Sequence, residues 1–469
     1  MEYVDPKGLL KKDLRQNWWR KYGTLSGRSY DGLPGELNRP DLAEITGQPL
    51  LNFLVALSFT RGRLNFASDI NLNVVYSDLV AAVYERGYER TRTYGPIRHM
   101  SLEQFHRVLE EVGLASWHGD GRSTTVREIE EHCRLSGVGP LLEAFQEGAK
   151  AGVTRLLAAF FFRQQGQRAS GDPTFVFTHK SFGEYLTSKR LARAAERIIR
   201  EIERRIASPD EGWDERDALK HWAQVCGASA ITRYLREFLV REIGLREEGQ
   251  TAAWQEQLAH LFSYLLKYGM PMEQMQGSTF RETLFRSRNA EEGLLVLLNA
   301  CAHVTQSESS VTHEDPTAFG AWFKRIQGQR TSAEPSLAAE CLSFMNLEGV
   351  FLDIADLYRA RLFRANLRGV AAHVACLELA DLRGADLTGA RLWKANLYGA
   401  TLDGADLGHA DLQEADLRNA SMSRVKTRQL NLRGTRFDGI RPDSIRKALE
   451  MEQRGESQRH EPDKRPRSK

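Results

Sequence analysis

The residues of this chain best suited to chemistry lie in the stretch FTHKSFGEYL, which runs from Phe177 to Leu186. It places His179 and Lys180 in an aromatic-rich run that opens a predicted helix. An imidazole beside a helix start can donate a hydrogen bond to a phosphate oxygen, because the first helical amides also attract an anion. The same spacing suits a strand followed by a helix with one buried face, in which His179 would only hydrogen-bond within the core. Other residues of the chain are needed to choose between phosphate contact and core packing for His179.

Phosphate binding and hydrolysis need further residues, which the sequence lacks. Nucleotide hydrolysis requires a glycine-rich loop with a lysine and a magnesium-holding hydroxyl, in the pattern GxxxxGK[ST]. Lys150 in GAKAG and Lys180 in THKS do not follow such a loop, and FLDIAD at 351–356 lies inside a repeat rather than on a Walker B strand. No GxSxG, HExxH or carboxylate pair occurs in a plausible context. The adjacent His132 and Cys133 would point about 100° apart on a helix, so they form no thiol site.

The elements that would position His179 are mostly helical. Residues 1 to about 330 show apolar residues at helical spacing, for example over 45–59, 71–86, 231–243, 254–266 and 290–302. A further helical face begins at Leu191 and continues to Ile206, and Pro209 and Gly212 end that helix.

Three sequence motifs in this helical part follow one another in the order found in a known family. They are TGQPLL at 46–51, a predicted helix at 70–86 with Tyr76 near its start, and PTFVFTHKSFGEYLTSKRLA at 173–192. Together they resemble the arm of NACHT-type STAND NTPases, in which a small helical domain precedes a winged helix. The resemblance covers roughly residues 10–200.

The resemblance implies two contacts with nucleotide. Pro49 would pack beside the adenine, and His179 would contact the ADP phosphates and hold the closed, inactive state. The family's nucleotide-binding domain needs far more residues than the 48 that precede Pro49 here. We therefore expect both contacts to be vestigial, with core packing the favoured role of His179, and we expect no bound cofactor.

The missing NTPase part admits three explanations. It lies upstream of Met1, or on a separately encoded NTPase chain, or the gene is a repurposed remnant. WWRKY at 18–22 resembles the helix that ends the family's NTPase core, which favours an upstream part.

The bulk composition excludes several classes of protein. The 469 residues include 65 basic and 62 acidic ones, a net charge of +3 that predicts no specific nucleic-acid partner. Five cysteines without a CxxC pair favour a reducing cytoplasm and argue against a metal site. The amino terminus lacks the apolar segment of a signal peptide, and the longest apolar run, LLAAFFF at 156–162, is far shorter than the ~20 residues that span a bilayer.

A five-residue repeat dominates the carboxyl-terminal part, as in ADLRG ADLTG ARLWK ANLYG. Its central positions run from Leu347 to Phe437, and seventeen of the nineteen hold Leu, Met or Phe, with Ala372 and Thr427 as the weak ones. A small residue, usually alanine, stands two positions before each centre. Helices repeat at 3.6 residues and strands at 2, so a period of five indicates a chain that turns a corner every five residues. The leucine and alanine then point inward, and the other three residues face water.

The repeat A(D/N)LXX resembles the pentapeptide-repeat family. The resemblance implies a right-handed, four-sided β-helix over 345–439 with one coil per twenty residues and a spacing of roughly 4.8 Å between coils. A capping helix is predicted at 442–450, because the open end of a solenoid has to be covered, and the residues after it read as a disordered tail. Some family members imitate DNA to engage topoisomerases, but 12 acidic against 13 basic residues between Met345 and Gly439 make a poor phosphate mimic.

The sequence thus predicts an α+β multidomain protein, mostly helical in its first two thirds. The predicted domains are a truncated STAND-type helical domain (1–95), a winged-helix-like domain (96–192), a helical linker domain (193–335), a quadrilateral β-helix (345–439), and a cap and tail (440–469). We expect a non-catalytic regulatory or protein-interaction protein of STAND signalling or defence, with the β-helix as docking rod. The alternatives are a STAND-class ATPase with a missing or separately encoded P-loop domain and a DNA-mimicking topoisomerase modulator. Protein partners and a possible oligomer are expected, and no membrane.

Overall fold

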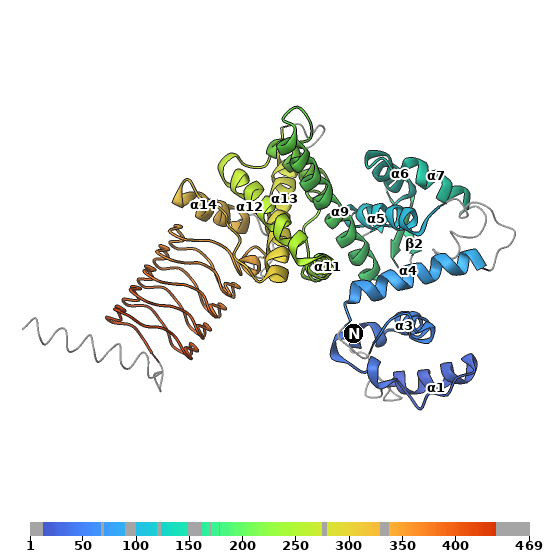
Figure 1. The fold of residues 1–469 in the computed structure, drawn as a ribbon, viewed down its shortest axis with the longest axis horizontal. Helices are drawn as coiled ribbons and strands as arrows, with labels where there is room; N and C mark the ends of the chain where they lie inside the picture. The colour runs from blue at the N-terminus through green and yellow to red at the C-terminus, as the bar shows by residue number, and fades with distance from the viewer. Residues whose placement is uncertain are drawn as a thin grey trace, which may run out of the picture. The chain divides into compact units, whose positions relative to one another are not determined.

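The computed structural model describes residues 13–66, 70–89, 100–119, 123–148, 162–168, 170–177, 179–273, 279–328 and 337–437 (Figure 1). The chain divides into two compact units, Met1–Arg190 and Leu191–Lys469. No helix in the described ranges is both long and apolar enough to cross a membrane.

The first unit begins with short helices around one buried tryptophan. They are α1 (Leu14–Ser26), the 3-10 turns η2 (Gly35–Leu37) and η3 (Pro40–Leu42), α2 (Ala43–Thr46), α3 (Pro49–Arg61) and α4 (Leu72–Glu89). The indole of Trp19 in α1 is fully buried and donates a hydrogen bond to Asn52 Oδ1 in α3 at 3.0 Å. The helical pattern predicted over 45–59 corresponds to two helices, because the chain breaks at Gly47 and Gln48 and a new helix starts with Pro49, a residue suited to a first helical position.

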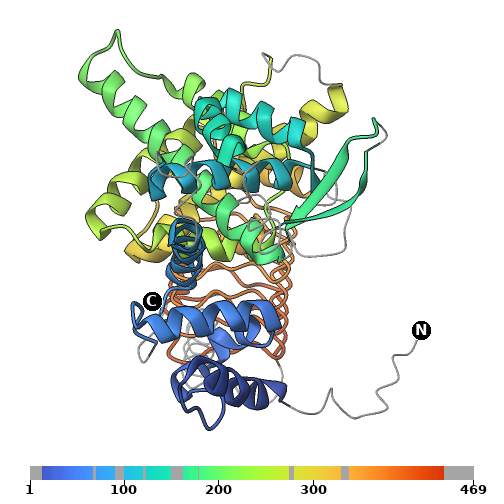
Figure 2. The same cartoon turned by 90° about the vertical axis from the view of Figure 1, so that its right-hand side faces the viewer.

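The rest of the first unit combines helices with a small antiparallel sheet. The order along the chain is α5 (Leu102–His118), β1 (Ser123–Thr124), α6 (Val126–Leu135), α7 (Gly139–Gly148), β2 (Phe162–Gln167), β3 (Pro173–Phe177) and α9 (Lys180–Ala207). The strands lie in the order β1-β3-β2, and the β2–β3 hairpin is drawn in green in Figure 2. Capping boxes at Ser101 and Thr125 fix the starts of α5 and α6. Gly113 lets α5 approach α9, since a Cβ there would lie 2.8 Å from Leu186 Cβ.

The helices of the second unit pack around one long, buried helix. They are α10 (Glu215–Cys226), α11 (Arg233–Ile243), α12 (Glu248–Tyr268), α13 (Phe280–Thr305), α14 (Pro316–Gly328) and the turn η7 (Ala339–Cys341). Every residue of α13 from Arg288 to Ala302 is buried. Two adjacent carboxylates in its middle, Glu291 and Glu292, accept hydrogen bonds from Trp322 of α14 and from the backbone of Ala338. Both contacted segments precede the repeat.

The repeat region is a stack of coils twenty residues long. Parallel bridges join residues twenty apart, from Asn346 with Asn366 to Asp416 with Arg436. The predicted inward positions are confirmed over most of the stack: from Ala380 to Leu417 every alanine and leucine of the repeat is at most 2% exposed. FLDIAD at 351–356 turns a corner within this stack and is not a continuous strand.

Each corner of the stack uses a left-handed residue. From Phe344 to Gly434 every fifth residue has a positive φ, between 52° and 74°. Seven of these nineteen positions are glycine and the other twelve carry side chains, two of which are β-branched, at Ile354 and Val374. Where an aspartate or asparagine precedes the leucine, its side chain supports the turn: Asp411 Oδ1, for example, accepts the backbone N–H of Gln413 at 3.1 Å.

The helical part of the second unit covers the first coil (Figure 1). The amides of Asn346, Phe351 and Arg361, which would otherwise face outward, donate to the carbonyl oxygens of Ser309, Pro316 and Ala339 at 3.3, 2.9 and 2.9 Å. Gly320 of α14 lies so close to the coil that a Cβ there would be 2.0 Å from the carbonyl oxygen of Phe351. Residues predicted as a linker domain therefore supply the cap of the β-helix. The capping helix predicted at 442–450 lies outside the described residues.

Candidate functional site

The stretch 177–186 lies where β3 gives way to α9. Phe177 is buried at the end of the strand, and His179 is half-buried just before the helix. Ser181 Oγ lies 3.5 Å from His179 Nδ1 and accepts a hydrogen bond from the phenol of Tyr76 at 2.7 Å. The hydrogen bond between Tyr76 and Ser181 joins the motifs at 70–86 and 173–192, and the two residues are 105 positions apart in the sequence.

Aromatic rings hold this junction together. The ring of Tyr76 packs edge-on against Phe182 at 4.9 Å and stacks on Tyr185 at 5.4 Å between centroids. Such pairs stabilise a core by about 0.5–1.5 kcal/mol beyond their burial. The aromatic residues Phe182 and Tyr185 therefore have a structural role, because they pack against α4. The sequence pattern did not predict that α4 is the helix they contact.

Pro49 lies on a different element. It is the exposed first residue of α3, whereas the side chains around His179 named above come from α4 and α9. The vestigial nucleotide contacts of Pro49 and His179 thus stay a prediction.

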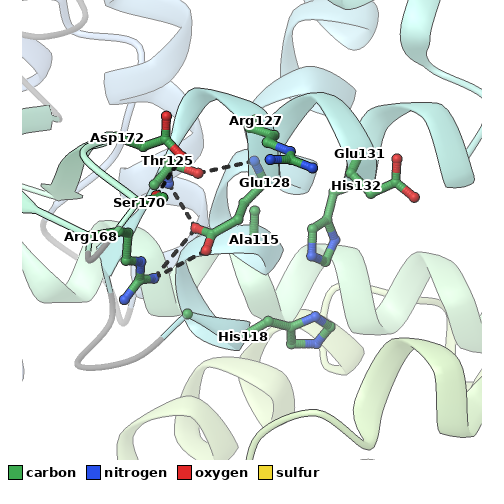
Figure 3. Close-up of a pocket in the computed structure, with 11 residues that line it drawn as sticks. Ala115, His118, Thr125, Arg127, Glu128, Glu131, His132, Arg168, Ser170 and Asp172 are labelled. Carbon is green, nitrogen blue, oxygen red and sulfur yellow. Dashed lines mark hydrogen bonds and ion pairs between the residues drawn. The ribbon is translucent and has the colours of Figure 1, made fainter. Parts of the chain in front are cut away.

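A polar pocket of about 430 Å³ lies between the end of α5, the start of α6 and the segment that joins β2 to β3 (Figure 3). Glu128 organises it: its carboxylate accepts the backbone N–H of Thr125 at 2.8 Å and pairs with Arg168 at 3.3 Å. Arg168 also donates to the carbonyl oxygen of Ser123 at 3.1 Å. These contacts tie the hairpin to α6.

Two histidines face each other across the pocket. The rings of His118 and His132 lie 4.9 Å apart (Figure 3). Burial and the nearby charge of Arg190 lower the pKa of His132 to about 4, so that this imidazole is neutral at physiological pH. Burial raises the pKa of the neighbouring Cys133 to about 12, so its thiol stays protonated and is no nucleophile.

Metal binding finds no support in the described residues. No group of three His, Cys, Asp or Glu side chains in the described ranges is arranged to hold a metal ion. The pocket offers polar side chains, among them Glu128, Arg168 and the two histidines.

The β-helix is the remaining extended surface. Its outward positions bring together residues twenty apart in sequence, so each side of the stack carries ladders of like-placed side chains. Ion pairs run along these ladders, such as Lys394 with Glu414 at 3.3 Å and Lys426 with Asp406 at 3.5 Å. The period of five in the sequence was sufficient to predict which positions face outward, and the charges offset one another as expected.

These stacked corners define a β-solenoid protein. Residues 375–413 and 402–439 match the family model for pentapeptide repeats. The carboxyl-terminal region of the chain belongs to the pentapeptide-repeat family. No similarity to a curated protein was found.

Three solved structures share the repeat with this chain. The pentapeptide repeat protein Rfr23 from the cyanobacterium Cyanothece 51142 is 30% identical over 19% of this chain and 65% of its own, with a TM-score of 0.16. HetL, a pentapeptide repeat protein involved in heterocyst differentiation regulation from Nostoc sp. strain PCC 7120, is 30% identical over 19% of this chain and 52% of its own, with a TM-score of 0.15. A pentapeptide repeat protein from the thylakoid lumen of Arabidopsis thaliana is 30% identical over 23% of this chain and 72% of its own, with a TM-score of 0.15. The chain thus spans less than two thirds of the length of the first two.

Proposed function

We propose that this chain is a non-catalytic protein-interaction protein in which a right-handed, four-sided β-helix is a docking rod. The observation that carries the proposal is the way the rod is held. Its first coil donates backbone hydrogen bonds to the carbonyl oxygens of Ser309, Pro316 and Ala339, which belong to the helical part of the second unit. A rod whose end is continuous with a helical body can transmit the binding of a partner to that body.

The chemistry of the side chains supports a binding role. Burial raises the pKa of the thiols of Cys133 and Cys301 to about 12 and of Cys341 to about 11, so these cysteines are inert at neutral pH. The sequence supplies no phosphate-binding loop. Work in a reducing cytoplasm is consistent with five cysteines that form no disulfide.

A STAND-type regulatory arm is the finer form of this proposal. Among the described residues of 102–177, the order helix, strand, two helices, hairpin supports a winged helix, and the contacts of Tyr76 with Ser181 and Phe182 would join that domain to the helix before it. The partner would then be a separately encoded NTPase or a domain upstream of Met1.

Nucleotide binding separates the proposal from its alternative, a STAND-class ATPase. We expect the purified full chain neither to hydrolyse ATP nor to bind ADP in isothermal titration. Micromolar ADP binding that is lost in His179→Ala and kept in the neighbouring control Lys180→Ala would establish the alternative instead.

Partner binding tests the docking role directly. Wild-type chain should enrich specific proteins from a lysate of the source organism, and substitution of outward residues of the rod should remove them while circular dichroism stays unchanged. Enrichment that does not depend on the rod surface would contradict the proposal.

A further inference from the structure

One side of the β-helix carries an excess of positive charge. Each coil consists of four five-residue units, and the units of successive coils stack into four sides. Over residues 345–437 the formal charges cancel on three of these sides. The fourth, which we call the arginine side, carries four arginines against two aspartates. It consists of residues 360–364, 380–384, 400–404 and 420–424.

The two aspartates of the arginine side are already engaged. Asp381 accepts two hydrogen bonds from the guanidinium of Arg383, at 2.7 and 2.6 Å. Asp403 accepts the hydroxyl of Ser421 at 2.7 Å, whereas the charge of Arg424 acts on it from too far away to form an ion pair. Neither carboxylate thus makes an ion pair with a second arginine in the described part of the chain.

A third arginine of this side, Arg361, is directed towards the helical residues before the repeat. Its guanidinium lies 3.9 Å from the carboxylate of Glu340. This carboxylate is buried and also pairs with Arg233 of α11 at 2.6 Å. The excess charge of the arginine side therefore resides on its two remaining arginines, Arg364 and Arg424.

Arg364 and Arg424 occupy the same corner of the stack, three coils apart. Both are exposed, and within the described ranges neither forms an ion pair. Gly384 and Gly404 hold this corner on the two coils between them. A Cβ added at Gly404 would meet nothing within 4 Å, and one at Gly384 would meet only the flexible side chain of Arg364, at 3.4 Å. The space between the two cations is therefore open to a partner.

An aromatic ring positions one of the two arginines. The guanidinium of Arg364 lies 5.2 Å from the ring centroid of Phe363, and that of Arg383 lies 5.6 Å from it. Contacts of this kind hold an arginine in place without neutralising its charge. A side chain that is already held loses less conformational entropy on binding, and arginine is enriched among the residues that dominate interface energies.

The spacing of Arg364 and Arg424 fits an extended peptide. Three coils at a spacing of roughly 4.8 Å separate the two positions by about 14 Å. In an extended chain, residues four apart lie on the same face at a distance of about 13 Å. Two acidic side chains at positions i and i+4 of such a chain can therefore reach both arginines at once.

A nucleic acid fits the arginine side less well than such a peptide. Its phosphates follow one another at short, regular intervals. Some of them would then face Asp381 and Asp403, which lie on the two coils between Arg364 and Arg424. A peptide can place uncharged residues there, and like charges brought together across an interface oppose binding.

We propose that the arginine side docks an extended acidic segment of a partner protein, whose carboxylates at i and i+4 pair with Arg364 and Arg424. This inference rests on the docking role proposed above, and it adds which side of the rod binds and what chemistry the partner presents.

The first test measures binding of a fluorescein-labelled peptide of about eight residues to the full chain by fluorescence polarisation. The peptide carries two glutamates four positions apart among threonine and valine. The double variant Arg364→Gln, Arg424→Gln should bind it about tenfold more weakly than wild type. The matched control Arg391→Gln, Arg433→Gln removes the same charge from exposed positions of a neutral side and should bind like wild type. No binding by wild type, or equal weakening in both variants, overturns the proposal.

The second test varies the ligand. A peptide with the two glutamates only two positions apart should bind about fivefold more weakly, because one carboxylate at a time can reach an arginine. Affinity that is independent of this spacing overturns the extended arrangement. Displacement of the labelled peptide by oligothymidylate at lower concentration than by unlabelled peptide assigns the side to nucleic acid and also overturns the proposal.

The lysate enrichment described above separates this inference from the docking role on which it rests. Loss of the enriched proteins in Arg364→Gln, Arg424→Gln, but not in Arg391→Gln, Arg433→Gln, supports both. If the first variant keeps these proteins while substitutions on another side remove them, the rod still docks a partner and the assignment to the arginine side is wrong.

Discussion

Trp322 of α14 donates its indole N–H to the carboxylate of Glu291 of α13 over 2.8 Å, and both side chains are buried. Arg325 and Ser287 hydrogen-bond to the same carboxylate. The adjacent Glu292 accepts the backbone N–H of Ala338 at 3.1 Å and pairs with Arg288 at 3.1 Å. Two neighbouring carboxylates on the central helix therefore hold both segments, α14 and 337–341, that cover the first coil of the β-helix.

Replacement of Glu291 by alanine should loosen this cap. The change leaves the buried indole N–H of Trp322 without its acceptor, which costs about 1–3 kcal/mol. The guanidinium of Arg325 also loses its partner, but it is 42% exposed and stays hydrated. We expect hydrogen exchange to become faster in α14 and in the first coil, while the last coils stay protected. The control is Glu256→Ala, at an exposed position of α12, where we expect a change within about 0.5 kcal/mol. Uniform loss of protection across the whole rod would show that the cap is not a separate element.

Gly320 should tolerate no side chain. A Cβ at this position would lie 2.0 Å from the carbonyl oxygen of Phe351, so Gly320→Ala must move α14 away from the coil. We expect a loss of about 1–3 kcal/mol in the free energy of unfolding, measured by urea denaturation. Gly328→Ala, at the end of the same helix with nothing within 4 Å of the added Cβ, is the control and should be neutral. Equal effects of the two changes would mean that helix propensity, and not contact with the coil, sets the result.

The two corners Val374 and Gly404 form a reciprocal pair. Both have positive φ, 58° and 74°, and a Cβ at Gly404 would meet nothing within 4 Å. Val374→Gly should therefore raise the stability of the β-helix, and Gly404→Val should lower it, each by about 1–2 kcal/mol. Thermal unfolding followed by circular dichroism measures both shifts. Shifts of the same sign would show that packing, rather than backbone conformation, controls these corners.

The sequence predicted the β-helix well because the five-residue period itself encodes which residues face inward. It could not reveal the left-handed corners, since most of them carry no glycine, nor the cap, since Ser309 and Ala339 lie in segments without strand patterning. No sequence pattern singles out Glu291 and Glu292, and only the packing of α14 and 337–341 against α13 shows why they are buried. The contact between Tyr76 and Ser181 joins residues too far apart for any local pattern to predict.

His132 should make the first unit sensitive to acid. Burial and Arg190 lower its pKa to about 4, while Glu128 and Glu131 act in the opposite direction. The folded protein therefore holds the neutral ring, and the unfolded chain takes up a proton first, near the ordinary value of 6.5. Stability is fully present above that value and falls as the pH is lowered towards 4, by about 2 kcal/mol at pH 5.

Comparison with His132→Gln isolates this contribution from the carboxylates that titrate in the same range. We expect wild type to lose about 2 kcal/mol more than the variant between pH 7 and pH 5, in urea unfolding followed by tryptophan fluorescence. Glutamine is uncharged at both pH values and similar in length, so it keeps the polar contacts of the pocket without taking up a proton. If the two proteins lose stability in parallel, His132 is protonated equally in the folded and unfolded states, and the neutral ring facing His118 is not what the fold selects.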